Sequence, residues 1–269
     1  MRSQQGVALA IVVWFIAGMS LLVAGIVAQA RVDTQLAQVH ADRARVIAAG
    51  DGAVRLLIAD IVSESRQRNL QEPPQLERRY RVGEQEVTIV ITPVQGLISL
   101  NDAQVPLLRE LFKQAAGMEQ GEAVALARTV NEWRNSRPRP RAAINTFEVG
   151  EDLLRVGGFS RGDFDQVRDY VVAGRMAGER TVPMIASPEV RQILAASGVP
   201  VGNPSQAAIR QILAGSPLRV DAIIKTGGRE WVRRQWLQEG NSGVTDLPWH
   251  AMRIEPPRVM RGKRRKTDG

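Results

Sequence analysis

The feature that most constrains this chain is a long apolar stretch close to its first residue. No charged residue occurs between Arg2 and Arg31, and residues 7–30 read VALAIVVWFIAGMSLLVAGIVAQA. At about 1.5 Å of rise per residue, a helix of this length crosses about 30 Å of hydrocarbon. Only Ser20 and Gln29 interrupt its apolar surface, so it lacks the polar face of a helix in water. We therefore expect a membrane-spanning helix.

The residues around this segment leave three interpretations open. In all of them, Arg2 before the apolar segment favours an orientation with the first residues in the cytoplasm and the remainder outside it. The triplet from Ala28 to Ala30 has the small-x-small form of a signal peptidase site, but the apolar run exceeds that of a usual signal peptide. A plain signal anchor is the second interpretation. The third is a prepilin leader, MRSQQG, cleaved after Gly6 so that the apolar helix is retained from Val7.

The helical pattern continues beyond the apolar segment. Apolar residues recur at spacings of three and four up to Ile61, and no proline occurs before Pro73. This predicts one helix from about Val7 to Arg68, about 90 Å long, with a weak point at residues 50–52, where two glycines occur. The outer half is amphipathic and needs a domain to pack against. A coiled-coil stalk is the alternative, although its heptads are irregular.

The rest of the chain predicts strands, then short helices, then strands again. The expected strands are 77–82, 86–94, a short one within 96–102, 218–225, 230–238 and 250–254, and the expected helices are 107–116, 119–134, 147–154, 161–172 and 188–196. The order indicates an α+β fold: a long transmembrane helix packed on a small antiparallel sheet, interrupted by an α-helical insertion.

Composition excludes several classes of function. The chain has no cysteine and only two histidines, His40 and His250, which excludes disulfides and thiolate metal sites and disfavours a histidine-rich zinc cluster. The net charge of +8 is concentrated in residues 258–269, which carry six basic residues against one aspartate. Such a run is typical of a solvated, disordered tail. The remainder is close to neutral, so the charge alone does not indicate nucleic-acid binding.

The sequence contains no catalytic constellation, and we expect no enzymatic activity. Asp163, Asp165 and Asp169 are interpreted as a solvated helix surface interleaved with arginines. The segment from Leu153 to Phe159 resembles one arm of a helix-hairpin-helix, which presents backbone amides to DNA phosphate. A membrane-anchored DNA-binding or DNA-uptake protein is therefore the alternative function.

Several stretches together resemble the minor pseudopilin of the type II secretion system, general secretion pathway protein K. The segments that carry the resemblance are the leader junction Gln5–Leu9, the G-x-x-x-L-N stretch in 96–102, Glu132-Trp133-Arg134, residues 147–159 and residues 186–190. The resemblance implies a pilin-like fold and a place in protein export. It divides the chain into a prepilin leader (1–6), a transmembrane helix (7–30), its periplasmic continuation (31–70), a first part of the sheet (75–101), the helical insertion (102–215), a last part of the sheet (216–256) and a basic disordered tail (257–269).

The same resemblance assigns roles to three residues near the start of the chain. Cleavage by prepilin peptidase would follow Gly6, and Val7 would then be N-methylated. Counting Val7 as the first residue, Ile11 occupies the fifth position, where most pilins carry a glutamate that neutralises a neighbouring subunit's amine. A subunit without that carboxylate suits the tip of the pseudopilus.

The resemblance also predicts location and partners. The protein would reside in the inner membrane with its domain in the periplasm. Its partners would be other minor pseudopilins, the major pseudopilin, prepilin peptidase and inner-membrane lipid, with no nucleic acid. Members of the family often have an acidic, calcium-binding loop, but residues 135–141 contain no carboxylate. We therefore expect no cofactor, and calcium remains an alternative that only the resemblance implies.

Overall fold

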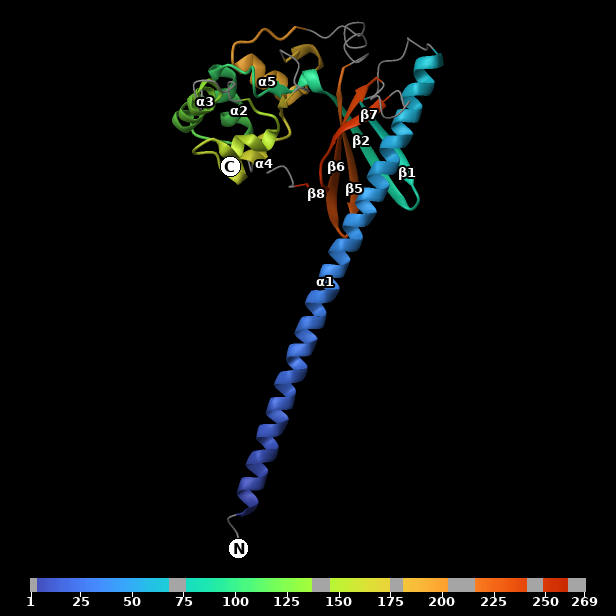
Figure 1. Ribbon diagram of the computed structural model, residues 1–269, viewed down its shortest axis with the longest axis vertical. Coiled ribbons are helices and arrows are strands. Elements are labelled where there is room, and N and C mark those ends of the chain that lie inside the picture. The colour runs from blue at the N-terminus through green and yellow to red at the C-terminus, as the bar shows by residue number, and fades with distance from the viewer. Residues whose placement is uncertain are drawn as a thin grey trace, which may run out of the picture.

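One helix dominates the structure. The computed structural model describes residues 4–67, 76–136, 146–174, 181–202, 216–240 and 249–260, with the side chains of 4–10 and 65–67 left undescribed. Helix α1 (Gln4–Gln67) runs without a break for 64 residues, and its first half projects away from the folded domain (Figure 1). The prediction of a single long helix is confirmed. The predicted weak point at residues 50–52 is wrong, because the helix continues through both glycines.

The second half of α1 lies across an antiparallel sheet. Its strand order is β1–β2–β5–β6–β7, and β8 pairs with β6 beside β7. The strands are β1 (Glu77–Val82), β2 (Gln85–Pro93), β5 (Leu218–Thr226), β6 (Arg229–Glu239), β7 (Trp249–Ile254) and β8 (Arg258–Val259). These bounds confirm the predicted main strands. The prediction of a disordered tail from residue 257 is wrong for Arg258 and Val259, because they pair with Val232 and Trp231.

One face of the sheet forms a core with α1. Side chains alternate between the two faces of a strand, so every second residue of β2 and β5 points at the helix. On the helix the buried residues recur at three- and four-residue spacings, which places them along a single stripe. The buried core residues are Val46, Ala49, Ala53, Val54 and Leu57 of α1, with Val87, Ile89, Ile91, Leu218, Val220, Ala222, Ile224, Trp231, Leu237 and Trp249 of the sheet.

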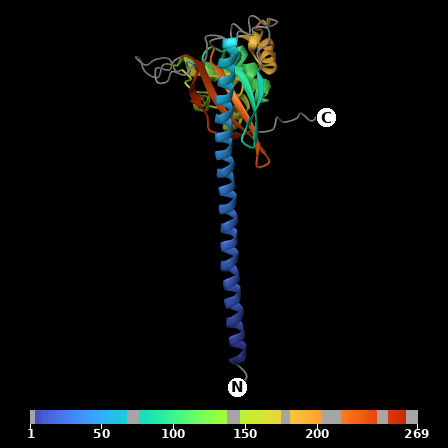
Figure 2. The same ribbon diagram turned by 90° about the vertical axis from the view of Figure 1, so that its right-hand side faces the viewer.

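A helical block lies on the other side of the sheet. Strands β2 and β5 are neighbours in the sheet, yet the chain between them passes through the whole block. The block holds α2 (Val105–Ala115), α3 (Gln120–Asn135), α4 (Arg161–Val167) and α5 (Pro188–Ala196), with 3-10 turns at 94–96, 150–155 and 183–185. It has its own core, in which Phe112, Phe147 and Phe164 are fully buried. In Figure 2, which is seen from the side of α1, the far half of the helix lies in front of the sheet and the block lies behind it.

Three predicted elements differ from the structure in this block. The short strand within 96–102 is β3 (Ile98–Ser99), which pairs in parallel with β4 (Val171–Val172) and not with the main sheet. The helix predicted over 161–172 ends at Val167, because the β-branched pair in β4 is used for that pairing. Residues 147–154 form a 3-10 helix only over Gly150–Arg155.

Candidate membrane and assembly interface

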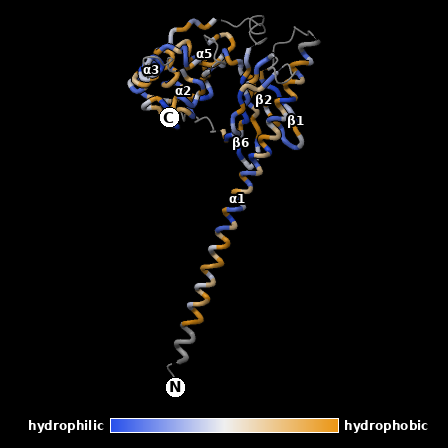
Figure 3. The backbone as a smooth tube through the Cα atoms, in the orientation of Figure 1, coloured by the Kyte–Doolittle hydropathy of each residue, from blue (hydrophilic) through white to orange (hydrophobic). Residues whose placement is uncertain are grey.

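The first half of α1 exposes a continuous apolar surface. Every described side chain from residue 11 to residue 40 is exposed, including Trp14 at 83% and Leu21 at 78%. An 18-residue window of this helix reaches a mean hydropathy of 2.5, and none of it is buried. Figure 3 shows the hydrophobic colouring concentrated along this part of the helix. A helix that is apolar on all sides and long enough to cross a bilayer requires hydrocarbon or another apolar surface around it.

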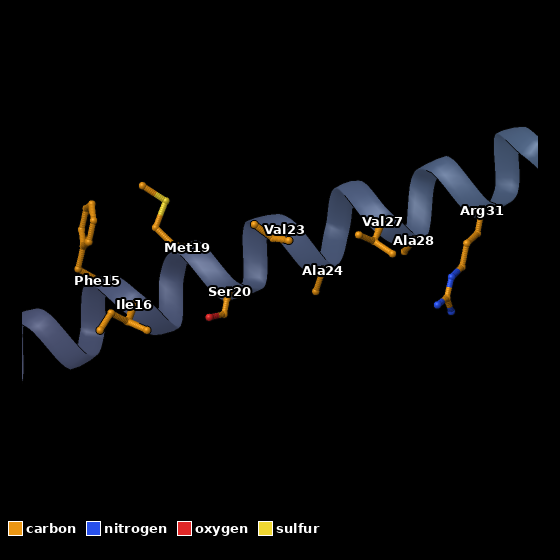
Figure 4. A pocket seen from close by; sticks show the side chains of 9 residues that line it. All are labelled: Phe15, Ile16, Met19, Ser20, Val23, Ala24, Val27, Ala28 and Arg31. Atoms are coloured by element: carbon orange, nitrogen blue, oxygen red, sulfur yellow. The ribbon is translucent and has the colours of Figure 1, made fainter.

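A shallow groove of about 680 Å³ follows one side of this apolar helix (Figure 4). Ser20, Ala24 and Ala28 recur at four-residue spacing in it, and the larger Phe15 and Met19 lie at one end. Small side chains at this spacing allow a second helix backbone to come close within a membrane. The groove is therefore a surface suited to packing between helices.

The predicted processing residues lie within the same helix. Gly6 and Val7 fall inside α1, which begins at Gln4, but their side chains are outside the described part. Ile11 is 64% exposed on the apolar half. The structure therefore brings these residues together on one helical segment, while their processing and assembly roles stay predictions.

The second half of α1 is fastened to the sheet by a charged contact. Asp51 accepts hydrogen bonds from Nε of Arg233 at 2.8 Å, from its Nη2 at 3.2 Å and from Nε2 of Gln235 at 2.7 Å. The Nη1 atom of Arg233 also donates to the carbonyl oxygen of Glu255 at 2.8 Å. The side chain of Arg233 is only 11% exposed, so solvent screens this ion pair less than a surface pair.

Two glycines on either side of Asp51 allow this contact. A Cβ atom at Gly50 would lie 2.9 Å from both Cβ and Cγ of Arg233, and one at Gly52 would lie 3.0 Å from Cγ1 of Val82. Real side chains do not tolerate the first distance, so glycine permits the close approach of helix and sheet. Gly50 and Gly52 lower the helix propensity, but they allow α1 to pack closely against the sheet.

The β5–β6 hairpin meets α1 where the packed half begins. Thr226 Oγ1 donates to Oδ1 of Asp42 at 3.4 Å. Gly227 has φ of +58°, and a Cβ atom there would overlap the Asp42 carboxylate. Both the backbone conformation and the space require glycine at this position. The hairpin tip therefore marks the boundary between the packed and the projecting halves of α1.

The opposite face of the sheet carries an ion network toward the helical block, in which Arg219, Asp221 and Arg234 are buried. Arg234 of β6 donates to Asp221 of β5 through Nε at 2.6 Å and through Nη2 at 2.9 Å, and its Nη2 also donates to Asp169 at 2.7 Å. Arg258 donates to Asp169 at 2.6 Å, and Arg219 donates to the carbonyl oxygen of Asp169 at 2.7 Å. The prediction that Asp169 lies on a helix is wrong, and its side chain, although 41% exposed, is bonded to arginines of the sheet. Helix α4 has ended before it, and the turn directs it toward the sheet.

The charged groups in this network shift one another's pKa values. Burial opposes ionisation of Asp221, but the guanidinium groups of Arg219 and Arg234 outweigh it and hold its pKa below the usual range. The pKa of Asp169 is lowered in the same way: burial is outweighed by Arg234 and Arg258. Burial and the charge of Arg234 lower the pKa of Arg219 to about 10. The two aspartates are therefore held ionised between these arginines.

A second group of charges extends the same interface. Glu255 accepts from Nη2 of Arg168 at 3.2 Å and from Nε1 of Trp236 at 3.1 Å. Arg253 of β7 donates to Glu151 of the 3-10 turn at 2.8 Å. Together with the Asp169 contacts, these bonds attach the helical block to β6 and β7. Strand β6 is thus bonded to α1 on one face and to the block on the other.

Three segments that carry the family resemblance meet inside the block. Asn101 exchanges two hydrogen bonds with the backbone of Phe147, at 2.8 and 3.0 Å. Trp133 stacks on the Phe147 ring with centroids 4.5 Å apart. Arg134 donates to the carbonyl oxygen of Leu100 at 2.9 Å. The three segments therefore have a joint structural role in holding the block's core.

The described residues at the place of the family's acidic loop do not fit a calcium site. Arg134 is buried, and its guanidinium already donates to the carbonyl oxygens of Leu100 and Ala103 and to Oδ1 of Asn131. A cation would meet this positive charge, and Asp102 is the one carboxylate among the described residues that line this hollow. Among the described residues, no group of three or more histidine or acidic side chains is placed to hold a metal. Residues 137–141 of the predicted loop lie outside the described part.

The segment proposed to contact DNA phosphate leads into α4, and a carboxylate already binds the backbone at the start of that helix. Leu153 and Phe159 are buried in the block's core. At the start of α4, the Asp163 carboxylate accepts from the backbone nitrogen of Ser160 at 3.0 Å, and also from its hydroxyl. A carboxylate at this position repels a phosphate group. The geometry therefore disfavours the DNA-binding alternative.

Comparison with known proteins finds a similarity to a solved structure. No family model matches this chain, and no curated protein matches it. The chain is similar to a chain from the crystal structure of the GspK–GspI–GspJ complex of the enterotoxigenic Escherichia coli type 2 secretion system. The similarity covers 86% of this chain and 100% of that one, at 10% sequence identity and a TM-score of 0.49. A likeness at this level does not assign a function.

Proposed function

We propose that this protein is a minor pseudopilin of a type II secretion system, held in the inner membrane by α1 with its folded domain in the periplasm. The observation that carries the proposal is the division of α1 into two halves. Residues 11–40 are exposed and mostly apolar, whereas the buried stripe from Val46 to Leu57 is built into the sheet. The resemblance of the leader junction around Gly6 and of the block's motifs to this family supports the same function.

The proposed role is mechanical and not catalytic. The Asp51 contacts hold α1 on one face of β6, and the Asp169 and Glu255 contacts hold the helical block on the other. A force applied to the projecting helix is therefore transmitted to the whole domain. Outside the bilayer the apolar half needs other apolar helices around it, which favours assembly into a filament of like subunits.

The proposed position in that filament is the tip. Ile11 offers no carboxylate to the amine of a subunit that would precede it. A subunit at the tip has no preceding subunit, so it needs no carboxylate at this position. The helical block would then cap the filament. Other minor pseudopilins and the major pseudopilin are the proposed partners, and prepilin peptidase would act first.

The mature first residue tests the proposal directly. Mass spectrometry of the protein from its own cell envelope should find N-methylated Val7. A Gly6→Val variant should accumulate as a slower-migrating precursor that retains residues 1–6. Gly18→Val is the matched control, because a Cβ atom at Gly18 meets nothing within 4 Å and the variant should be processed normally.

The remaining results would each contradict the proposal. A chain starting at Arg31 would identify a cleaved secretory signal, and a chain starting at Met1 would identify a plain anchor. Normal processing of Gly6→Val would exclude the prepilin interpretation even if Val7 were found. Failure of the purified protein to associate with other pseudopilins in detergent would remove the assembly role.

A further inference from the structure

Strand β1 is the outermost strand at one end of the main sheet, and its outer side has no partner strand among the described residues (Figure 1). It pairs with β2 over six residues without a bulge. The backbone nitrogen of Ile91 donates to the carbonyl oxygen of Leu76 at 2.7 Å, so these two residues form a hydrogen-bonded pair. Bonded and non-bonded pairs alternate along an antiparallel ladder, so the backbone N–H and C=O groups of Glu77, Arg79 and Arg81 point away from β2. They are the donors and acceptors that an added strand requires.

The side of this edge that faces α1 is apolar. A Cβ atom added at Gly52 of α1 would lie 3.0 Å from Cγ1 of Val82, so this side of the helix lies over β1. Leu56 follows one turn later on the same side and is 44% exposed. Leu76 is 40% exposed and lies on the same face of the sheet, because it is paired with Ile91 of the core. An added strand would therefore place alternate side chains beside Leu56 and Leu76.

The other side of the edge is basic. Tyr80 packs against the core that α1 covers. The side chains of Glu77, Arg79 and Arg81 lie on the opposite face, because they alternate with that of Tyr80, and all three are exposed. Thr88 of β2 lies opposite Arg79, so this arginine has no carboxylate across the ladder. Its positive charge is left to face a carboxylate on the outer side of the strand.

We propose that the outer edge of β1 binds, in antiparallel orientation, an extended segment of another protein in which apolar and acidic residues alternate. Antiparallel addition continues the existing sheet and places directly opposed side chains on one face. The acidic side chains would then lie opposite Arg79 and Arg81, and the apolar ones beside Leu56 and Leu76. Charged side chains on an edge strand oppose the addition of strands of like charge, so the arginines select for an acidic partner. The inference goes beyond the proposed function, because it depends on the folded domain and not on a filament.

A second copy of this chain is the other occupant to consider. In an antiparallel pair of β1 strands centred on Arg79, the two Arg79 side chains would lie opposite each other, and like charges at this spacing are destabilising. The two-fold axis of such a pair stands perpendicular to the sheet, so the α1 helix of the second copy would run in the reverse direction. The two projecting apolar halves would then point to opposite ends, and one bilayer would not hold both. The observations therefore favour a different chain.

Synthetic peptides test the proposal on the full chain in detergent. A peptide of about eight residues in which valine and glutamate alternate, labelled with a fluorophore, should bind in fluorescence anisotropy titrations. The same peptide with lysine in place of glutamate should bind at least about tenfold more weakly. Arg79→Glu should weaken binding of the glutamate peptide by about three- to tenfold. Arg128→Glu is the matched control, because this exposed arginine lies in α3, and it should leave binding unchanged.

N-methylation of the glutamate peptide tests the backbone contacts. In antiparallel pairing the glutamates lie opposite Arg79 and Arg81, so their N–H groups face β1 and their methylation should abolish binding. Methylation of the valines should leave binding largely intact. Valine methylation that weakens binding as much or more, equal binding of the glutamate and lysine peptides, or no binding would each overturn the proposal. Disulfide cross-linking of Arg79→Cys protein into dimers, without cross-linking of Arg128→Cys protein, would show that the edge binds a second copy and that the proposal is wrong.

Discussion

Asp51 of α1 faces Arg233 of β6 with Oδ1 and Nε 2.8 Å apart, and this pair joins the first long helix to a strand 182 residues later in the chain. The pair lies between Gly50 and Gly52, where added Cβ atoms would lie 2.9 Å from Arg233 and 3.0 Å from Val82. This charged contact and the two glycines therefore add to the apolar core in fixing how the packed half of α1 lies on the sheet.

Replacing Asp51 by alanine should lower the free energy of unfolding of the domain by about 1–3 kcal/mol, because Arg233 and Gln235 lose their acceptor in a partly buried place. Denaturant titration of the full chain in detergent, followed by tryptophan fluorescence, measures this. Glu230→Ala removes an ion pair whose Lys225 side chain is 81% exposed. That control should change stability by no more than about 0.5 kcal/mol.

Gly50→Ala should destabilise the domain, because the new Cβ atom would lie 2.9 Å from Arg233 and must push the helix away from β6. Overpacking of this kind costs about 1–3 kcal/mol. Gly121→Ala in α3 is the matched control, since a Cβ atom there meets nothing within 4 Å. Alanine should stabilise that helix by up to about 1 kcal/mol. Equal effects of the two substitutions would contradict the close-approach role of Gly50.

Acid should loosen the attachment of the helical block to the sheet. The folded-state pKa values of Asp169 and Asp221 lie below their ordinary values. The stability they contribute is therefore complete above the unfolded-state pKa of about 3.9 and is lost as pH falls through the lower folded-state values. The denaturant midpoint should stay level above about pH 5 and fall below about pH 4. An Asp169→Asn variant should show a smaller fall, and parallel curves for the two proteins would contradict the role of Asp169.

Ile11→Glu should alter the position of the subunit in the filament while leaving its membrane insertion largely intact. Ile11 is near one end of the apolar segment, where a carboxylate can reach the headgroup layer. Met19→Glu near its centre is the control, and should impair insertion because a charge there costs about 3 kcal/mol. Carbonate extraction of membranes measures insertion, and cross-linking to the other pseudopilins measures position. Unchanged cross-links for Ile11→Glu would contradict the tip assignment.

Removal of calcium should leave the stability of the helical block unchanged. The carbonyl oxygens of Leu100 and Ala103 are already bonded to Arg134, which supplies the positive charge at that place. Thermal unfolding of the full chain with a chelator and with millimolar calcium should give the same midpoint. Arg134→Gln should lower that midpoint in both conditions. A rise on adding calcium to the unaltered protein would show that residues outside the described part form a calcium site.

The sequence contained enough to predict most of the elements and little of how they are bonded together. The main strands and the helices α1, α2, α3 and α5 follow from local apolar periodicity, which neighbouring residues determine. The helix predicted over 161–172 extended too far, because Val171 and Val172 pair with β3, about 70 residues earlier in the chain. Local periodicity contains no information about such a distant partner.

The bonded network was missed for the same reason. Arg233, Arg234 and Gln235 stand between apolar residues in the middle of a predicted strand, and that placement was the available signal that their charges are buried and paired. Sequence could not identify Asp51 as one partner or Asp169 as another. Pairing depends on which elements meet across the two faces of β6, and that is a property of the assembled chain.

The sequence by itself determined the apolar helix, because 24 consecutive uncharged and mostly apolar residues give a helix without a polar face. Only the tertiary structure decided at which residue that helix begins to pack against the domain. The limit is set at Asp42 by the β5–β6 hairpin, and Gly50, Asp51 and Gly52 hold the packed half against the sheet. The physical reason is that hydrophobicity is a property of a local segment, whereas close packing and ion pairing require particular distant residues to meet.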